Sequence, residues 1–139
     1  MKKIVAILVL FFISGLIFSQ TSSYDSRLYV RYSETELENI RNSEPQFLEL
    51  LTFKLDHSYY FIDIDINTDK TYPLLYEMDY ATKKISDVAV DNISVSGFNI
   101  LKYAIESNPN NRVVYRIGNS GLGLVLYSDK EVMAEFNKN

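Results

Sequence analysis

The residues best suited to bind a metal ion lie in the acidic segment Asp63–Asp69, where oxygen-bearing side chains occupy alternate positions. EF-hand calcium loops begin with this spacing, because Ca²⁺ prefers six to eight hard oxygen ligands. Such a loop also needs glycine at its sixth position and glutamate at its twelfth, where this chain has Thr68 and Leu74. A β-strand gives the same alternation, with Ile64 and Ile66 facing inward and the carboxylates in water. We therefore assign no metal ligand, and calcium binding by this segment stays open.

His57 is the only histidine of the chain and stands between Asp56 and Ser58. One imidazole cannot build a multi-histidine metal site, although it can serve as a general base. Neighbours in sequence point in different directions, so this tripeptide is not a Ser-His-Asp triad, which is defined by spatial roles. The simplest interpretation is an exposed histidine between a helix and a strand. We assign no catalytic residue, and a small hydrolase that combines His57 with paired carboxyl groups across a cleft is the least favoured alternative.

The glycine-rich segment 118–123 resembles a phosphate-binding loop only in composition. Its glycine order differs from the dinucleotide fingerprint, and a strand rather than a helix follows it. Glycine and asparagine tolerate the positive φ angles of a tight hairpin, which explains the segment. Gly123 indicates a bulge or a close backbone approach. We therefore expect no bound cofactor.

Tyrosine is the unusual feature of the composition, since the chain has 11 tyrosines and no tryptophan. A tyrosine ring combines apolar area with a polar tip, which suits protein interfaces and the stacking of sugar rings. Tyrosine is also a favoured strand residue that lines sheets. The candidate surface for a partner or ligand consists of Tyr59, Tyr60, Tyr72, Tyr76 and Tyr80.

Three segments carry the start signals of α-helices. Two of them follow a serine that has glutamate three residues later, which is a capping box, and the other has proline in its first turn. The expected helices are Glu34–Asn42, Glu44–Leu55 and the terminal stretch from Ser128 to Asn137.

Several other segments have the alternation or the β-branched and aromatic content of strands. They are 28–32, 58–66, 72–79, 84–90, 98–106, 113–117 and 122–127. Segments 72–79 and 84–90 are expected to form a hairpin, and the last three segments a meander. The segment Phe98–Glu106 also has apolar residues at helical spacing, and the turn residues around it favour a strand. The whole predicts an α+β fold, in which an antiparallel sheet of four to six strands has two or three short helices packed on one face.

The amino terminus has the features of a secretory signal peptide. Lys2 and Lys3 precede an apolar run that ends at Phe18, and polar residues follow at once. We expect cleavage after Ser19, a flexible leader at 20–26 and one domain at 27–139. The protein is then exported to the periplasm, the outer cell surface or the medium, with no membrane span after cleavage. The chain has no cysteine, so this domain folds without disulfides.

Charge and motifs limit the function classes. The net charge is −4, and loss of Lys2 and Lys3 makes it −6, which opposes nucleic-acid binding. No nucleophile motif, metal cluster or cofactor loop is recognisable. We therefore expect a non-enzymatic binding or accessory module that docks a protein of the cell envelope through a tyrosine-rich sheet face or edge. The first alternative is a carbohydrate-binding module, in which tyrosines stack on a glycan and Asp63, Asp65 or Asn67 bind its hydroxyl groups.

Overall fold

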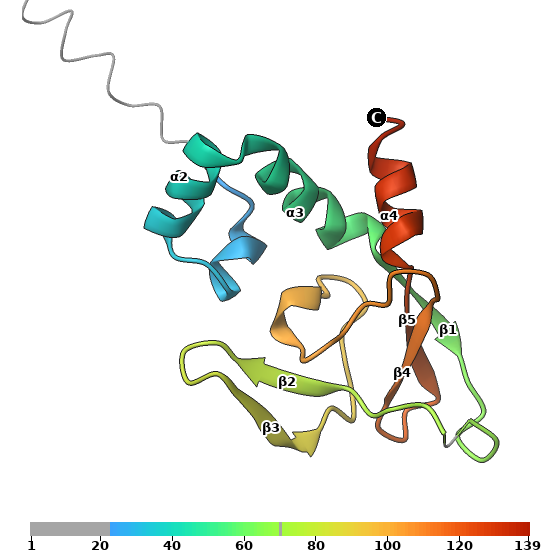
Figure 1. Ribbon diagram of the computed structural model, residues 1–139. Helices are drawn as coiled ribbons and strands as arrows, with labels where there is room; N and C mark the ends of the chain where they lie inside the picture. Colours follow the sequence, from blue (N-terminus) through green and yellow to red (C-terminus); the bar gives the residue numbers. More distant parts are fainter. Residues whose placement is uncertain (1–22, 70) are drawn as a thin grey trace, which may run out of the picture.

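The computed structural model describes residues 23–69 and 71–139 (Figure 1). The expected signal peptide, 1–19, and the first residues of the expected leader lie outside this part of the chain. The elements are η1 (Ser26–Val30), α2 (Glu34–Ser43), α3 (Pro45–His57), β1 (Tyr59–Asp63), β2 (Tyr76–Asp79), β3 (Lys84–Ala89), η2 (Ile100–Lys102), β4 (Val113–Ile117), β5 (Leu122–Leu126) and α4 (Asp129–Phe136). Three α-helices and antiparallel strands confirm the α+β class.

The three predicted helices are present, and their ends follow the predicted signals. In α2 the Ser33 hydroxyl accepts a hydrogen bond from the Glu36 amide, and the Glu36 carboxylate accepts one from the Ser33 amide. The same capping box begins α4 at Ser128. Helix α3 begins at Pro45, where the missing N–H is not needed, and runs two residues past the predicted end at Leu55.

The five strands are divided between two antiparallel sheets. One has the order β1-β5-β4, and the other is the hairpin of β2 and β3 (Figure 1). The segment before β2 joins the sheets, because the Leu75 amide donates to the Arg116 carbonyl at 2.9 Å and the Leu75 carbonyl accepts from Val90 at 2.9 Å. The predicted hairpin is therefore confirmed, and it continues from the edge of the larger sheet.

The predicted three-stranded meander is wrong in its first strand, because Phe98–Glu106 is not a strand, while its last two strands pair as β4 and β5. Its centre is the 3₁₀-helix η2, and only Tyr103 forms an isolated bridge, with Glu77 of β2. The reason is the buried Asn99, whose side-chain oxygen accepts from the Leu101 amide at 3.1 Å. Such a local hydrogen bond competes with a sheet ladder. The third strand of the larger sheet is instead β1, which pairs Tyr59 with Leu126.

The predicted strand at 28–32 is also wrong, since η1 occupies this segment. The Asp25 carboxylate caps η1 by accepting from the Arg27 amide, and Leu28 is buried. Tyr24 donates to the Glu38 carboxylate at 2.6 Å and packs against the core. The last residues of the expected leader therefore contact the domain.

The strand expected at 58–66 is present as β1 but ends at Asp63. Its core-facing residues are Tyr59 and Phe61, while Tyr60 and Ile62 lie on the opposite face. The isoleucine positions therefore do not provide the inward face that the sequence pattern predicts.

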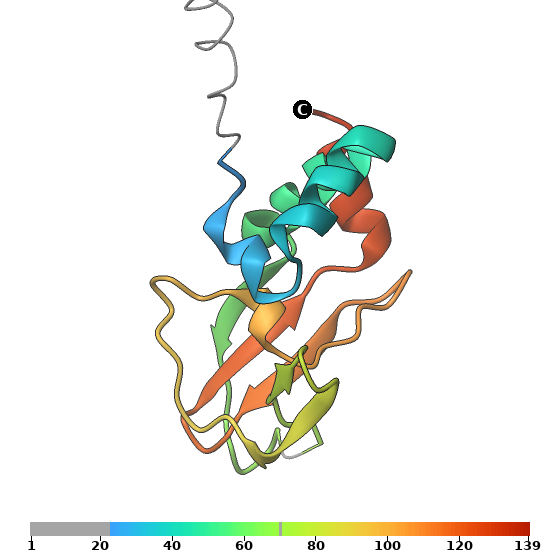
Figure 2. The same ribbon diagram turned by 90° about the vertical axis from the view of Figure 1, so that its left-hand side faces the viewer.

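One core joins the helices to the inner face of the larger sheet. Figure 2 shows the three α-helices gathered at one end of the molecule and the strands at the other. The core residues come from both ends and from the η2 segment between them: Leu28, Leu37, Leu55, Leu75, Phe98, Ile100, Tyr103, Tyr115, Ile117, Leu124 and Leu126. No helix among the described residues is long and apolar enough to span a bilayer.

Candidate functional site

The five candidate tyrosines do not share one surface. Tyr59 packs edge-on against Phe98 in the interior, with ring centroids 4.9 Å apart. Tyr60 lies on the opposite face of β1, beside Tyr127. Tyr80 is at the turn of the β2–β3 hairpin, where the Arg31 guanidinium lies 5.3 Å from its ring centroid. The five candidate tyrosines therefore do not form one binding surface. Each of them is half-buried.

The hairpin exposes two large apolar side chains, and neither is a tyrosine. Val88 is 73% exposed and Ile85 is 56% exposed, and both belong to β3. Val95, in the loop that follows, is 55% exposed. Among the described residues these three are the most exposed large hydrophobic side chains, and we call them the hairpin patch.

Ile85 and Val88 of the hairpin patch lie on an edge strand whose ladder is interrupted. Met78 pairs with Ile85 and Tyr76 with Ala89, so a bulge of β3 stands opposite Glu77. Within the bulge the Ser86 hydroxyl accepts from the Val88 amide at 3.1 Å. Bulges of this kind hinder the addition of a further strand. A partner of β3 would therefore contact its side chains and would not pair with its backbone as a further strand.

A second polar and aromatic cluster covers the outer face of the larger sheet near the start of α4. The Arg112 guanidinium lies 4.9 Å from the Tyr127 ring centroid and donates to the Tyr60 hydroxyl at 3.2 Å. It also forms an ion pair with Glu131 at 2.6 Å. The hydrogen bond from Arg112 is the main cause that lowers the pKa of Glu131 to about 2, and hydrogen bonds from Ser128 add to it.

Because of this ion pair, the contribution of Glu131 to stability is expected to depend on pH, and replacing Arg112 is expected to shift that dependence. The folded-state pKa of Glu131 lies below its ordinary value of 4.5, so its stabilising contribution is present above pH 4.5 and is lost as pH falls toward 2. Replacing Arg112 by glutamine is expected to raise the pKa of Glu131 while leaving it below 4.5, because Ser128 still donates to the carboxylate. A carboxyl-carbon NMR titration of both proteins measures this. An unchanged pKa in Arg112→Gln would contradict the assignment.

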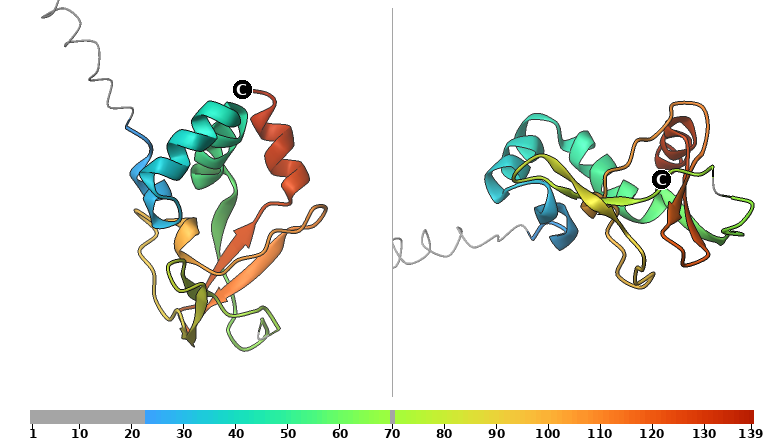
Figure 3. Two further views of the ribbon diagram at one scale, coloured as in Figure 1. Left: turned by 60° about the vertical axis from the view of Figure 1, so that its left-hand side comes forward. Right: turned by 90° about the horizontal axis from the view of Figure 1, so that it is seen from below.

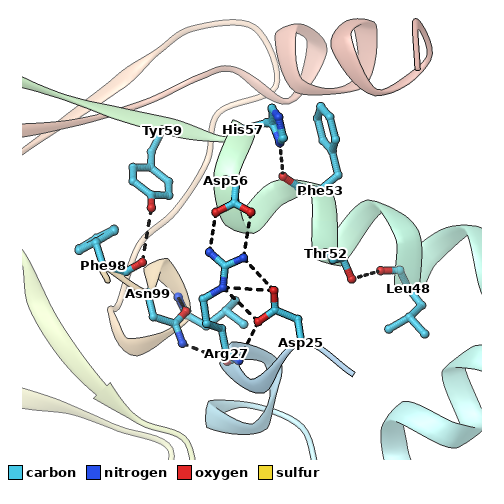
Figure 4. Close-up of polar contacts among 11 residues, drawn as sticks. Asp25, Arg27, Leu48, Thr52, Phe53, Asp56, His57, Tyr59, Phe98 and Asn99 are labelled. Atoms are coloured by element: carbon cyan, nitrogen blue, oxygen red, sulfur yellow. Dashed lines mark hydrogen bonds and ion pairs between the residues drawn. The ribbon is translucent and has the colours of Figure 1, made fainter. Parts of the chain in front are cut away.

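His57 lines a cleft of about 520 Å³ between the end of α3 and α4. Its ring stacks on Phe53 at a centroid distance of 4.1 Å, and Nδ1 lies 3.0 Å from the Phe53 carbonyl oxygen (Figure 4). A carbonyl can only accept, so Nδ1 carries a hydrogen and the neutral ring has its acceptor at Nε2. The cleft near His57 that a hydrolase would require is therefore present.

The carboxylates of this cleft are unsuited to acid catalysis. Each one is held in an ion pair that lowers its pKa, with the hydrogen bond from the partner as the main cause. The pairs are Asp56 with Arg27, Glu131 with Arg112, and Glu135 with Lys138. Glycoside hydrolysis by a carboxyl pair needs one member with a raised pKa. The geometry thus gives no support to a paired-carboxylate hydrolase.

The Asp56–Arg27 pair is instead part of a structural network. Arg27 also binds Asp25 at 2.7 Å, and its backbone carbonyl accepts from the side chain of the buried Asn99 at 3.0 Å (Figure 4). The network connects η1, the end of α3 and the start of η2. Its role is to hold these elements together.

The acidic segment that follows β1 uses its carboxylates within its own turn. Asp69 accepts from the Asp65 amide at 2.9 Å, and Asp65 accepts from the Asn67 amide at 2.9 Å. In the part of the chain that is described, no group of three or more histidine or acidic residues is placed to hold a metal ion. Local turn geometry therefore accounts for these hydrogen bonds without a ligand.

The glycine-rich segment forms the turn between β4 and β5, as predicted. Gly118 and Gly121 have φ angles of +47° and +74°. A Cβ atom on Gly123 would lie 2.8 Å from a methyl group of Ile64 and 3.2 Å from Ile62. Gly123 thus marks a close approach of side chains to the centre of the sheet.

Comparison with known proteins identifies no relative of this chain. No protein-family model matches the sequence, and no match is found among curated proteins or solved structures. The case for a function therefore depends on the geometry of these residues.

Proposed function

We propose that this protein is an exported, non-enzymatic binding module that docks a protein of the cell envelope through the hairpin patch. The observation that carries the proposal is the exposure of Ile85 and Val88 on an edge strand. Large apolar side chains gathered on the surface of a small domain mark interaction sites more often than singly scattered ones do.

The position of the hairpin suits such a contact. Figure 3 shows β2 and β3 at the opposite end of the molecule from α2 and α4, so a partner could approach them without meeting these helices. At the hairpin turn, Tyr80 is half-buried against Arg31. Contact between the turn and the body reduces the motion that a partner would otherwise have to restrict on binding.

The same geometry favours a protein over a glycan. Sugar binding by stacking needs several aromatic rings that lie flat on one exposed face. Tyr60 and Tyr127 are neighbours on the outer face of the sheet, but their rings are inclined by 41°. Asp65 and Asn67 take part in the turn described above. A protein partner is therefore the occupant that the described surface supports.

Affinity capture of the native exported protein from its own cells tests the proposal. The substitutions Ile85→Asp and Val88→Asp place a charge on the hairpin patch, and each is expected to reduce the co-purifying protein at least tenfold. Met133→Asp is the matched control, because Met133 is an exposed apolar residue of α4, 38% exposed, on a different element. The control is expected to capture the partner as the wild type does.

Two results would overturn this function. One is equal capture of the same protein by wild type and both β3 variants. The other is the absence of any specific protein combined with retention on a glycan column, which would favour the carbohydrate-binding alternative.

A further inference from the structure

A second, smaller cavity lies between α3, the η2 segment and the start of α4. Its volume is about 200 Å³, and it is separate from the hairpin patch. The aliphatic side chains of its wall are Leu51, Leu55, Ile100, Leu101, Ile105, Leu126 and Val132. We call it the α3–η2 pocket.

Two cationic side chains and one carboxylate line this pocket. Arg31 forms no ion pair with any carboxylate in the described ranges, and its guanidinium lies near the rings of Tyr32 and Tyr80. Lys54 lies 4.0 Å from Asp129, which is the outer limit of an ion pair. The lining thus has a positive balance in a chain whose net charge is −4.

Apolar walls with an excess of positive charge define the chemistry of a ligand. We propose that the α3–η2 pocket binds a small molecule that has an apolar body and a single anionic group, such as a short monocarboxylate. The guanidinium of Arg31 offers donors in a fork that matches a carboxylate, and the ammonium of Lys54 adds a second positive charge. The inference does not depend on the docking function of the hairpin.

The volume of the pocket sets the size of this ligand. One water molecule takes about 30 Å³ in the liquid, so 200 Å³ holds roughly six or seven groups of methylene size. The five-carbon apolar body of hexanoate fits this space, and hexylamine and hexanol provide a six-carbon chain with a cationic and a neutral end. Acetate has the anionic group without the apolar body.

Titration of the isotopically labelled protein with these four compounds, followed by amide NMR shifts, tests the proposal. Hexanoate is expected to shift amides of the pocket wall and to bind at least fivefold more tightly than either hexylamine or acetate. Arg31→Gln and Lys54→Gln are each expected to lower the affinity for hexanoate two- to fivefold, because a partly exposed ion pair contributes about that much. Both variants are expected to leave the affinity for hexanol unchanged. Arg31→Lys retains the charge and is expected to keep most of the affinity.

Lys84→Gln is the matched control, because Lys84 is an exposed lysine of β3 outside the pocket wall and its loss changes the net charge equally. Three results would overturn the proposal. They are equal affinity for hexanoate and hexylamine, an equal effect of Lys84→Gln and the two pocket variants, and shifts confined to residues outside the α3–η2 pocket. These outcomes bear on ligand binding in the α3–η2 pocket alone. They leave the docking function of the hairpin patch untouched, because none of the four compounds tests protein docking.

Discussion

Replacing Leu124 by alanine is expected to lower the free energy of unfolding by about 3 kcal/mol. Leu124 lies at the middle of β5, the central strand of the larger sheet, and its side chain is completely buried. Its neighbours across the sheet are Phe61 on one side and Tyr115 on the other, so the lost methyl groups leave a cavity that both strands enclose. Small domains have about 5–15 kcal/mol of stability, so this one change removes a large fraction of it.

Urea denaturation followed by circular dichroism measures this loss. Leu122→Ala is the matched control, because Leu122 belongs to the same strand but is only half-buried at its end. Leu122→Ala is expected to lower the free energy of unfolding by at least 1 kcal/mol less than Leu124→Ala does, since it removes less apolar area from the interior. Equal losses in the two variants would contradict the greater burial of Leu124.

Replacing Gly118 by alanine is expected to cost about 3 kcal/mol, for two separable reasons. The first is its φ angle of +47°, which costs roughly 1–2 kcal/mol for a residue with a Cβ atom. The second is space, because that Cβ atom would lie 2.6 Å from the Cα atom of Asp91. A side chain could rotate away, but the Asp91 backbone has to shift, which adds roughly 1–3 kcal/mol.

Gly121→Ala separates the two causes. Gly121 has a similar φ angle of +74°, and its nearest contact to an added Cβ is the Ile64 carbonyl oxygen at an ordinary 3.8 Å. Thermal unfolding of both variants is expected to show the larger loss for Gly118→Ala. If Gly121→Ala is equally destabilised, the close approach of Asp91 is not the cause.

Local signals in the sequence were sufficient for most helices and hairpins. The serine and glutamate pairs at Ser33 and Ser128 predict the first turns of α2 and α4, because each capping box involves only residues within one turn. The turn residues around 79–83 and 118–121 likewise predict the hairpins on either side. In all these cases the interactions that decide the structure lie between close neighbours in the chain.

Non-local interactions explain what the sequence did not predict. The pairing of β1 with β5 cannot be derived from either segment alone, and it gives β1 the place beside the last two strands that the sequence assigned to Phe98–Glu106. The sequence pattern did not show which face of β1 is inward, because Tyr59 and Phe61, which pack against the core, alternate with the isoleucines as regularly as any two faces of a strand. Tyrosine positions were similarly ambiguous, since a ring in the core and a ring at a surface have the same local pattern.

The hairpin patch had one signal that was available in the sequence. Ile85 and Val88 are three residues apart, so they cannot both face one side of a regular strand. The structure resolves this mismatch with the bulge around Ser86 and leaves both side chains exposed. The irregular spacing of these two apolar residues is therefore the sequence feature that corresponds to the bulge and to the exposed side chains.

The central place of β5 also affects the order in which the chain can fold. The strand comes just before α4, yet it pairs with β1, which is the first strand of the described chain. Contacts between distant segments slow folding, because a long loop must close before they form. During synthesis the larger sheet therefore stays open until the carboxyl-terminal residues have emerged.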